Sequence, residues 1–421
     1  NTTGTYNTAI GFGTLASTTT GSFNSAVGHG ALLSNAAGNN NSAFGYFALF
    51  FNTVSNNSAF GFNALRDNTT GASNSAFGYS ALRKNTIGTD NTAFGLGALN
   101  NNTTGSYNVA VGRYALLSNT TGITNIAIGV ASLQTNTIGS NNTAVGHGTL
   151  QNNTTGVLNT AVGRSALSLN TIGDSNSAFG SYALTANTTG TFNTAVGRAS
   201  LTSNTIGTNN TAVGFATLIN NTTGINNTAV GSQALRLNVV GSSNAAFGTY
   251  ALYNNTTSNN TAFGYKALYS NTIASQNVAV GGYSLNSNTI GSFNTAVGLW
   301  SLGSNTTGSE NTAVGRYALS ANTFGDGNTA MGMSALYANT TGYGNSAFGR
   351  YALRLNTIGI YNTAVGYGSL YNNTTGNYNV TIGREAGYTN IVGSNNTSVG
   401  YQALYSNTTS NNSAFGYKAL T

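Results

Sequence analysis

The sequence predicts an all-β protein: a β-solenoid, or parallel β-roll, of about 25 turns with a 17-residue repeat. Three observations support this fold class. A self-similar unit starts at an Asn 25 times between Asn7 and Asn412, and only three of the intervals are 16 rather than 17 residues. The apolar positions of the unit fit neither the 3.6-residue period of a helix nor a sustained alternation. The chain has no proline, as expected where nearly every backbone N–H pairs with an adjacent turn.

Composition narrows the classes of function. Charged residues make up 5% of the chain, against ~25% in a typical soluble domain, and the net charge of +7 is spread thinly along the repeats. No basic cluster indicates nucleic acid as a partner, and no apolar run approaches the ~20 residues of a membrane helix, so we expect no membrane insertion. The absence of cysteine excludes disulfides and Cys metal sites.

The repeat runs through the chain without a linker or a shift in composition. We therefore expect residues 1–421 to form a single continuous array, with no evident capping repeat at either end. Solenoids normally need caps, because an open end exposes apolar interior and unpaired strand edges. The pattern favours either a window of a longer chain or self-association of copies into an end-to-end filament.

Each repeat can be numbered from its leading Asn as slots 1 to 17. Slot 1 is Asn and slot 5 is Gly in all 25 copies, slot 3 is almost always Ala, and slot 9 is Leu in all but one. We expect the apolar slots 4, 9 and 14 to point inward, and Gly (slots 5 and 15) and Asn (slots 1 and 12) to be corners that tolerate positive φ. Stacked turns place Asn on Asn as a hydrogen-bonded ladder. In one turn the predicted ladder residues are Asn108, Ala110, Val111, Gly112, Leu116, Asn119 and Gly122.

The constant small residues indicate a close approach of backbone. Slots 1, 3 and 5 (Asn, Ala and Gly) face the side of the strand opposite to slots 2 and 4. Such uniform smallness predicts contact with either a second face of the same coil or a neighbouring subunit, and the neighbour is slightly favoured.

A few copies depart from the pattern. The short copies at Asn41, Asn244 and Asn396 replace the Gly-containing corner by a Ser-Asn turn, which predicts an exposed loop there. The copy that starts at Asn379 is the most degenerate, with Thr381 at slot 3 and Gly387 at slot 9, and we expect a local weak point or kink.

The variable slots identify the outside of the coil. Every Lys and Arg lies at slot 6, 7, 10 or 11, and tyrosines and phenylalanines also favour the variable slots. The aromatic residues either pack along the surface between turns, which is the favoured interpretation, or form a stacking surface for glycans or another fibre. The candidate surface contacts are Tyr114, Tyr265, Trp300, Tyr367 and Tyr401.

The sequence shows no cluster that indicates catalysis. His29 and His147 both occupy slot 6, but they lie seven turns apart and cannot share a metal. The 6 acidic residues are scattered, so no carboxylate pair can be inferred. We predict no catalytic, metal-binding or cofactor-binding residue, no cofactor and no enzymatic activity.

The repeated unit, as in Asn193-Thr-Ala-Val-Gly and Asn204-Thr-Ile-Gly, resembles the β-roll repeats of YadA-like trimeric autotransporter adhesin heads. It is similar also to the repeat regions of phage tail fibres and large bacterial surface proteins. The resemblance covers the whole chain, although the adhesin heads use a repeat shorter than 17 residues. It implies a bacterial or phage-derived homotrimeric fibre, located outside the cell or on its surface, that adheres to a host surface.

Together these patterns predict an extracellular structural fibre or filament subunit, with adhesion as a further role. One alternative is a glycan-binding surface or tail-fibre module that uses the Tyr-rich outer slots. Another is an ice-binding array of Thr and Asn, with stacked Thr at slots 2 and 13, although Val109, Ile126, Val278 and Val380 interrupt the Thr row at slot 2.

Overall fold

The computed structural model describes residues 2–421 and is all-β throughout them, with no helix. Each repeat contributes one three-residue strand, which occupies slots 2 to 4, and the strands pair in parallel. This arrangement confirms the predicted β-solenoid and is compatible with β-roll repeats. The chain forms two compact units, Asn1–Asn209 and Asn210–Thr421, and each is described by itself.

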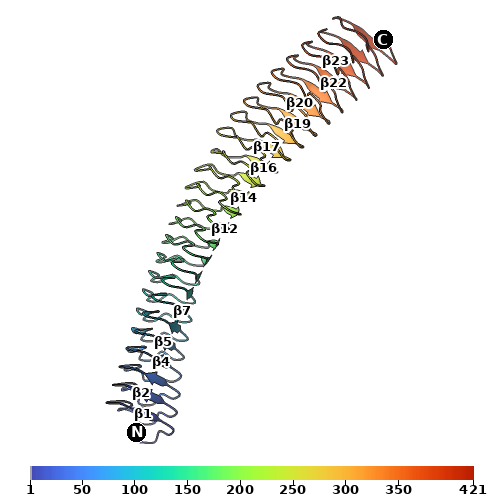
Figure 1. The fold of residues 1–421 in the computed structure, drawn as a ribbon. Coiled ribbons are helices and arrows are strands. Elements are labelled where there is room, and N and C mark those ends of the chain that lie inside the picture. Colours follow the sequence, from blue (N-terminus) through green and yellow to red (C-terminus); the bar gives the residue numbers. More distant parts are fainter. Residues whose placement is uncertain (1) are drawn as a thin grey trace. The chain divides into compact units, whose positions relative to one another are not determined.

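In the first unit successive turns stack one strand on the next (Figure 1). Thr160, for example, lies in register with Thr143 on one side and Ser177 on the other. The strands are β1 (Thr8–Ile10), β2 (Ser25–Val27), β3 (Ser42–Phe44), β4 (Ser58–Phe60), β5 (Ser75–Phe77), β6 (Thr92–Phe94), β7 (Val109–Val111), β8 (Ile126–Ile128), β9 (Thr143–Val145), β10 (Thr160–Val162), β11 (Ser177–Phe179) and β12 (Thr194–Val196).

The second unit repeats the same arrangement, with Thr312 in register with Thr295 and Thr329. Its strands are β13 (Thr211–Val213), β14 (Thr228–Val230), β15 (Ala245–Phe247), β16 (Thr261–Phe263), β17 (Val278–Val280), β18 (Thr295–Val297), β19 (Thr312–Val314), β20 (Thr329–Met331), β21 (Ser346–Phe348), β22 (Thr363–Val365), β23 (Val380–Ile382), β24 (Thr397–Val399) and β25 (Ser413–Phe415).

The interior of each turn is small. In the turn that starts at Asn108, the side chains of Asn108, Ala110, Ala115, Leu116 and Asn119 are all 0% exposed. Leu at slot 9 is the only large residue among them, so opposite walls of one coil approach closely. The small-residue side therefore faces the inside of its own coil, and the preference for a neighbouring subunit at this face is wrong.

Two of the three apolar slots expected to point inward face outward instead. Because Ala110 at the centre of its strand points inward, alternation turns Val109 and Val111 to the outside, where both are half-buried. Slot 14 lies at an exposed corner, where Ile172 and Ile206 are each 52% exposed. Only the Leu of slot 9 is inward as predicted, because the narrow coil has no room for bulk on every face.

The predicted asparagine ladder is present along the interior. The Nδ2 of Asn159 donates to Gly173 O (2.8 Å) in its own turn and to Asn142 Oδ1 (3.2 Å) in the turn before. Its Oδ1 accepts from the backbone N (3.0 Å) and the Nδ2 (3.2 Å) of Asn176 in the turn after. Each amide thus links three turns in a region that excludes water.

A second ladder runs through slot 12 and ends on the same carbonyl. The Nδ2 of Asn170 donates to Asn153 Oδ1 (2.8 Å) and to Gly173 O (2.9 Å). Gly173 O therefore accepts one amide from each ladder, from Asn159 at slot 1 and Asn170 at slot 12. This shared acceptor ties two sides of the turn together across the interior.

Of the four slots predicted to have positive φ, only slot 5 has it; slots 1, 12 and 15 do not. Positive φ occurs instead at slots 7, 9 and 17, with values of 59° at Tyr114, 50° at Leu116 and 57° at Thr124. Burial of the Leu116 side chain, and its N–H bond to Ser132 O (3.0 Å), hold this residue in a conformation that L-residues otherwise avoid. Asn is constant at slots 1 and 12 because of its side-chain bonds.

The glycine of slot 5 has two physical reasons to be constant. Gly146 has a φ of 134°, a region that side chains disfavour, and a Cβ there would lie 2.7 Å from Gly163 O of the next turn. Gly122 at slot 15 lacks positive φ, but its Cβ would collide with Gly139 O and lie 2.5 Å from Asn119 Oδ1. Both glycines are required by close backbone approach.

The short turns keep the strand register. Val54 O replaces the slot-15 carbonyl and accepts from the Nδ2 of Asn41 (2.8 Å) and of Asn52 (2.7 Å), while β3 and β4 stay paired. The slot-12 ladder is affected, because the Oδ1 atoms of Asn35 and Asn238 in the preceding turns are buried without a hydrogen-bond partner. The deletion is thus absorbed at the corner, and part of one ladder is lost.

The degenerate copy redistributes volume inside the coil. Thr381, buried at slot 3, lies with its hydroxyl 2.6 Å from Ser369 Oγ. A Cβ on Gly387 would lie 3.0 Å from Thr381 Cγ2 and 3.3 Å from Leu370 Cδ1. The loss of Leu at slot 9 therefore makes room for the larger residue at slot 3, and β22, β23 and β24 remain paired in register.

Substitution of Gly146 by Ala should destabilise the fold by about 3 kcal/mol, because backbone strain adds to a collision with the next turn. The measurement is the free energy of unfolding in denaturant. Gly148→Ala is the matched control, since Gly148 has a φ of 61° with more open space around its Cβ, and Ala131 already occupies the same slot with a φ of 56°. Equal losses in the two variants would contradict the role given to slot 5.

Asn159→Asp should lower the free energy of unfolding by about 3 kcal/mol at pH 7, because it buries a charge against the Gly173 carbonyl. Burial raises the folded pKa of this carboxyl above its unfolded value of about 3.9, so the variant is most stable below about pH 4 and loses stability as pH rises through the folded pKa. Denaturation across this pH range tests the ladder.

Thr154→Val provides the control for an outer hydrogen bond. It removes only the bond from Thr154 Oγ1 to Thr171 O (3.0 Å) and should cost about 1 kcal/mol with no pH dependence. A pH-independent Asn159→Asp variant would show that the slot-1 amides are not buried.

Candidate binding surface

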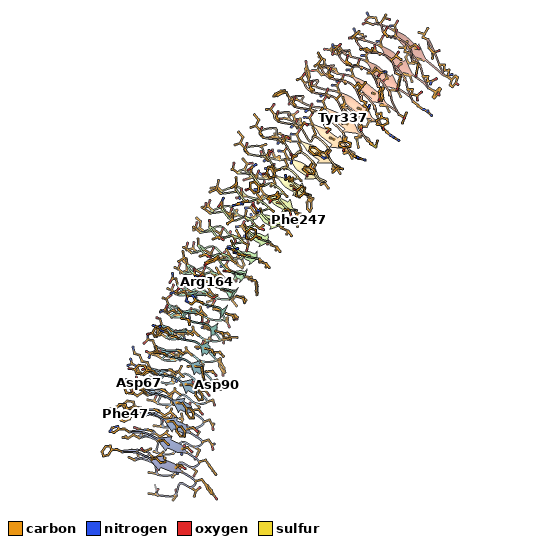
Figure 2. The ribbon with its side chains drawn as sticks, in the orientation of Figure 1. Phe47, Asp67, Asp90, Arg164, Phe247 and Tyr337 are labelled. Atoms are coloured by element: carbon orange, nitrogen blue, oxygen red, sulfur yellow. The ribbon has the colours of Figure 1, made fainter. Side chains whose placement is uncertain are left out.

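The outer slots 6, 7 and 10 of successive turns line up along the stack. Figure 2 draws the side chains along the ribbon and labels Arg164 of slot 6, together with Asp67 of slot 11 and Asp90 of slot 17. In the first unit slot 6 carries a row of parallel rings whose neighbouring centroids lie 5.3, 5.1, 5.2 and 5.1 Å apart: Phe12, His29, Tyr46, Phe62 and Tyr79. Rings in such a row cover one another's faces, as expected from packing between turns.

Basic side chains in the second unit lie against tyrosine rings. The Arg354 guanidinium is 5.6, 5.3 and 5.6 Å from the ring centroids of Tyr337, Tyr351 and Tyr371. Its Nη1 donates to the Tyr371 hydroxyl (2.6 Å). These cation–π contacts hold the guanidinium within the aromatic surface.

A stacked tyrosine row continues from this cluster. The rings of Tyr371, Tyr388 and Tyr405 follow one another at centroid distances of 5.0 and 5.3 Å. Partial burial raises the pKa of the Tyr388 phenol, and its neighbours, including Glu385, raise it further because they disfavour a negative charge there. These rings leave little open face for a ligand.

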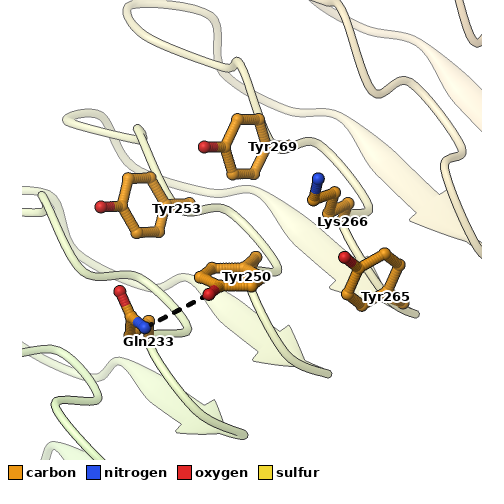
Figure 3. Close-up of a pocket in the computed structure, with 6 residues that line it drawn as sticks. All are labelled: Gln233, Tyr250, Tyr253, Tyr265, Lys266 and Tyr269. Carbon is orange, nitrogen blue, oxygen red and sulfur yellow. Dashed lines mark hydrogen bonds between the residues drawn. The ribbon is translucent and has the colours of Figure 1, made fainter.

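One open groove lies in the second unit, with a volume of about 410 Å³ (Figure 3). It is built from slots 6, 7 and 10 of three successive turns, which start at Asn227, Asn244 and Asn260. The side chains that line it are Gln233, Tyr250, Tyr253, Tyr265, Lys266 and Tyr269.

The tyrosines of the groove are not all stacked. Tyr253 and Tyr269 lie parallel, with centroids 5.2 Å apart and an angle of 18° between their planes. Tyr250 is inclined to them by 65° and 83°, at 5.7 and 6.3 Å. Because Tyr250 crosses the row, an open volume remains between the rings, and Tyr265 is 44% exposed beside it.

Polar groups complete the groove. Gln233 Nε2 lies 3.4 Å from the Tyr250 hydroxyl, and Gln233 Oε1 accepts from Arg236 Nη1. Lys266 Nζ lies 5.4 Å from the ring centroids of both Tyr265 and Tyr269. Within residues 2–421 it forms no ion pair with a carboxylate. The groove thus offers aromatic surface, phenol and amide groups, and one ammonium.

The predicted surface residues do not gather at one place. Tyr114, in the first unit, is half-buried beneath the Arg113 guanidinium at 4.7 Å. Trp300 stacks on Tyr283 at 4.6 Å with 8° between the ring planes. Trp300 thus packs against the turn before it, whereas the contact of Tyr114 with Arg113 lies within one turn.

The remaining three predicted surface residues lie, like Trp300, in the second unit. Tyr367 and Tyr401 flank the Arg384 guanidinium at 5.6 and 5.8 Å. Only Tyr265 belongs to the groove. Sequence reasoning missed Tyr250 and Lys266, although a comparison of slots 6, 7 and 10 across neighbouring turns contains the signal for them.

The alternative of an ice-binding array of Thr and Asn cannot use the asparagines of slots 1 and 12, which face the interior. Asn142 and Asn153, for example, are 0% exposed. At slot 13 the hydroxyl of Thr120 is used within the protein, since it donates to Thr137 O (3.0 Å). An ice-binding face would therefore have to use the threonines of slots 2 and 13, and the row at slot 2 is interrupted.

Metal ligands are not gathered in the part of the chain that the structure describes. No group of three or more His, Asp or Glu side chains lies together there. His29, one of the two histidines, is stacked between Phe12 and Tyr46. Over residues 2–421 there is also no helix of the length and apolarity needed to cross a membrane.

Comparison with known proteins adds no family: no protein-family model matches the chain, and a search of curated proteins found no match.

Proposed function

We propose that this chain is an extracellular structural fibre or filament subunit without enzymatic activity. The observation that carries the proposal is the interior, where two asparagine ladders and the backbone bonds connect each turn to its neighbours. In the turn of Asn159, for example, the bonds reach only the turns of Asn142 and Asn176. Such nearest-neighbour construction suits a protein that extends and bears load.

The repeat pattern supports a location on or outside the cell. Its resemblance to the β-roll repeats of YadA-like adhesin heads and phage tail fibres favours a bacterial or phage fibre that contacts a host surface. Partners of this kind would meet the outer slots, because the constant Asn, Ala and Leu of slots 1, 3, 9 and 12 are inside the coil.

Self-association is part of the proposal, and we favour an end-to-end filament over a homotrimer. The Asn and Ala side that would have supplied a subunit interface is consumed inside each coil, as at Asn108 and Ala110. A trimer would instead have to use outer rows such as Phe44, Phe60 and Phe77, whose rings stack at 4.8 and 4.7 Å.

Electron microscopy of unlabelled particles should give a mass per unit length of about 0.36 kDa per Å, the value for a single stack that rises ~4.8 Å per turn. A value about three times larger would contradict the single-stack filament and support a homotrimer in register. Chains that remain single at every concentration and ionic condition would contradict self-association in either form.

A second candidate function is glycan binding through the Tyr-rich outer slots. The groove at Tyr250 favours it, because aromatic rings, phenol hydroxyls and an amide converge on one open volume. This function is compatible with a structural fibre, since the groove uses none of the interior slots.

A glycan panel tests the second candidate. The double variant Tyr253→Ser/Tyr269→Ser should weaken binding at least tenfold, because it removes the parallel rings of one wall. Tyr388→Ser is the matched control: it removes a stacked tyrosine from the same slot outside the groove and should leave binding unchanged. Ser168 and Ser320 already occupy slot 10, so the substitutions suit the fold. A blank panel would reject this function.

A further inference from the structure

We infer that the groove between Tyr250 and Lys266 binds an anionic saccharide, one that carries a carboxylate or a sulfate. The inference deepens the glycan-binding candidate above and rests on it. In the stacked rows the rings of adjacent turns cover one another, as Tyr371 and Tyr405 cover Tyr388. In the groove Tyr250 interrupts the row, and both ring and polar surface stay open.

The arrangement of the rings favours a saccharide. A pyranose has an apolar face, which packs on an aromatic ring, and a rim of hydroxyl groups, which need hydrogen-bond partners. Tyr265, which is 44% exposed, supplies open ring surface, and the stacked pair of Tyr253 and Tyr269 forms a wall of the groove in two adjacent turns. Gln233 and the Tyr250 hydroxyl supply amide and phenol groups at one end of the groove (Figure 3).

Charge selects an anionic ligand. The acidic residues nearest in sequence are Asp174, which lies in the other unit, and Glu310, so the turns around the groove contain no carboxylate. Arg236 and Lys266 are the charged residues of these turns. Arg236 donates to Gln233 and lies 5.8 Å from the Tyr253 ring centroid, while the Lys266 ammonium, which itself lines the groove, lies beside the rings of Tyr265 and Tyr269.

The ammonium and the rings act together on such a ligand. The Lys266 residue is half-buried, and an opposite charge a few ångströms from its ammonium gains more than it would in bulk water, because the neighbouring rings exclude part of the solvent. A neutral saccharide would cover this ammonium and displace water from it without supplying an opposite charge. The expected selectivity is therefore for uronate-containing or sulfated oligosaccharides over neutral ones of equal length.

The experiment is calorimetric titration of the full chain with an oligogalacturonate, a sulfated oligosaccharide and a neutral oligosaccharide of matched length. Lys266→Gln should weaken the charged ligands about tenfold, equivalent to 1.4 kcal/mol, and leave the neutral one unchanged. Lys266→Arg should retain binding, and binding of the charged ligands should weaken as salt rises. Gln233 and Gln402 already occupy slot 7 with positive φ, so Lys266→Gln suits the fold.

Lys418→Gln is the matched control. Lys418 follows Tyr417 as Lys266 follows Tyr265, with its Nζ 5.6 Å from the ring, but it lines no part of the groove. Equal loss in the Lys418 and Lys266 variants would overturn the site, and equal affinity for neutral and charged oligosaccharides would overturn the anionic selectivity.

Two further outcomes separate this inference from the proposals on which it builds. Tighter binding of polyglutamate than of any saccharide would overturn the saccharide and point to an acidic peptide. No binding of any glycan by the unmodified protein would overturn both this inference and the glycan-binding candidate. The mass per unit length would be unaffected in either case, so the filament proposal would stand or fall separately.

Discussion

The need to satisfy buried amides in every turn governs this structure. Two asparagines per turn, such as Asn159 and Asn170, lie inside the coil and donate to the carbonyl of Gly173 as well as to the turn before. A buried amide without partners is costly, so the carbonyl must return to the same place in each turn. This requirement accounts for a repeat length that varies only between 16 and 17 residues and for the close backbone approach that makes glycine necessary.

The same constraint limits how much apolar surface the coil can bury. A coil narrow enough for an amide to reach across it holds one large side chain per turn, the Leu of slot 9, whose burial contributes roughly 2 kcal/mol. Bulky residues such as Val111 and Ile172 are left outside. The protein therefore combines an interior of hydrogen bonds and small residues with an exterior rich in aliphatic and aromatic groups.

The sequence was sufficient to predict the fold class, the asparagine ladder and the inward Leu. In a stack of turns, a residue that is the same in every repeat usually contacts its copies in the adjacent turns. It misled at Val111 and Ile172, since constant bulk was interpreted as burial, although the Ala at the centre of each strand indicates the opposite alternation. The positive φ at Tyr114 and Leu116 has no signature in residue type. Tyr265 was predicted at the surface, but its neighbours Tyr250 and Lys266 become visible only when adjoining slots are known.

A constant interior and a variable exterior allow a binding site to arise at little energetic expense. Each turn bonds only to its neighbours through the constant slots, so replacements at slots 6, 7 and 10 leave the ladders untouched. At slot 7 the chain carries residues as different as Gly148, Gln233, Tyr250 and Lys266 on the same backbone conformation. Three adjacent turns are enough to bring rings, an amide and an ammonium together. In such a protein the outer residues of adjacent turns determine ligand specificity, while the repeated inner residues determine the fold.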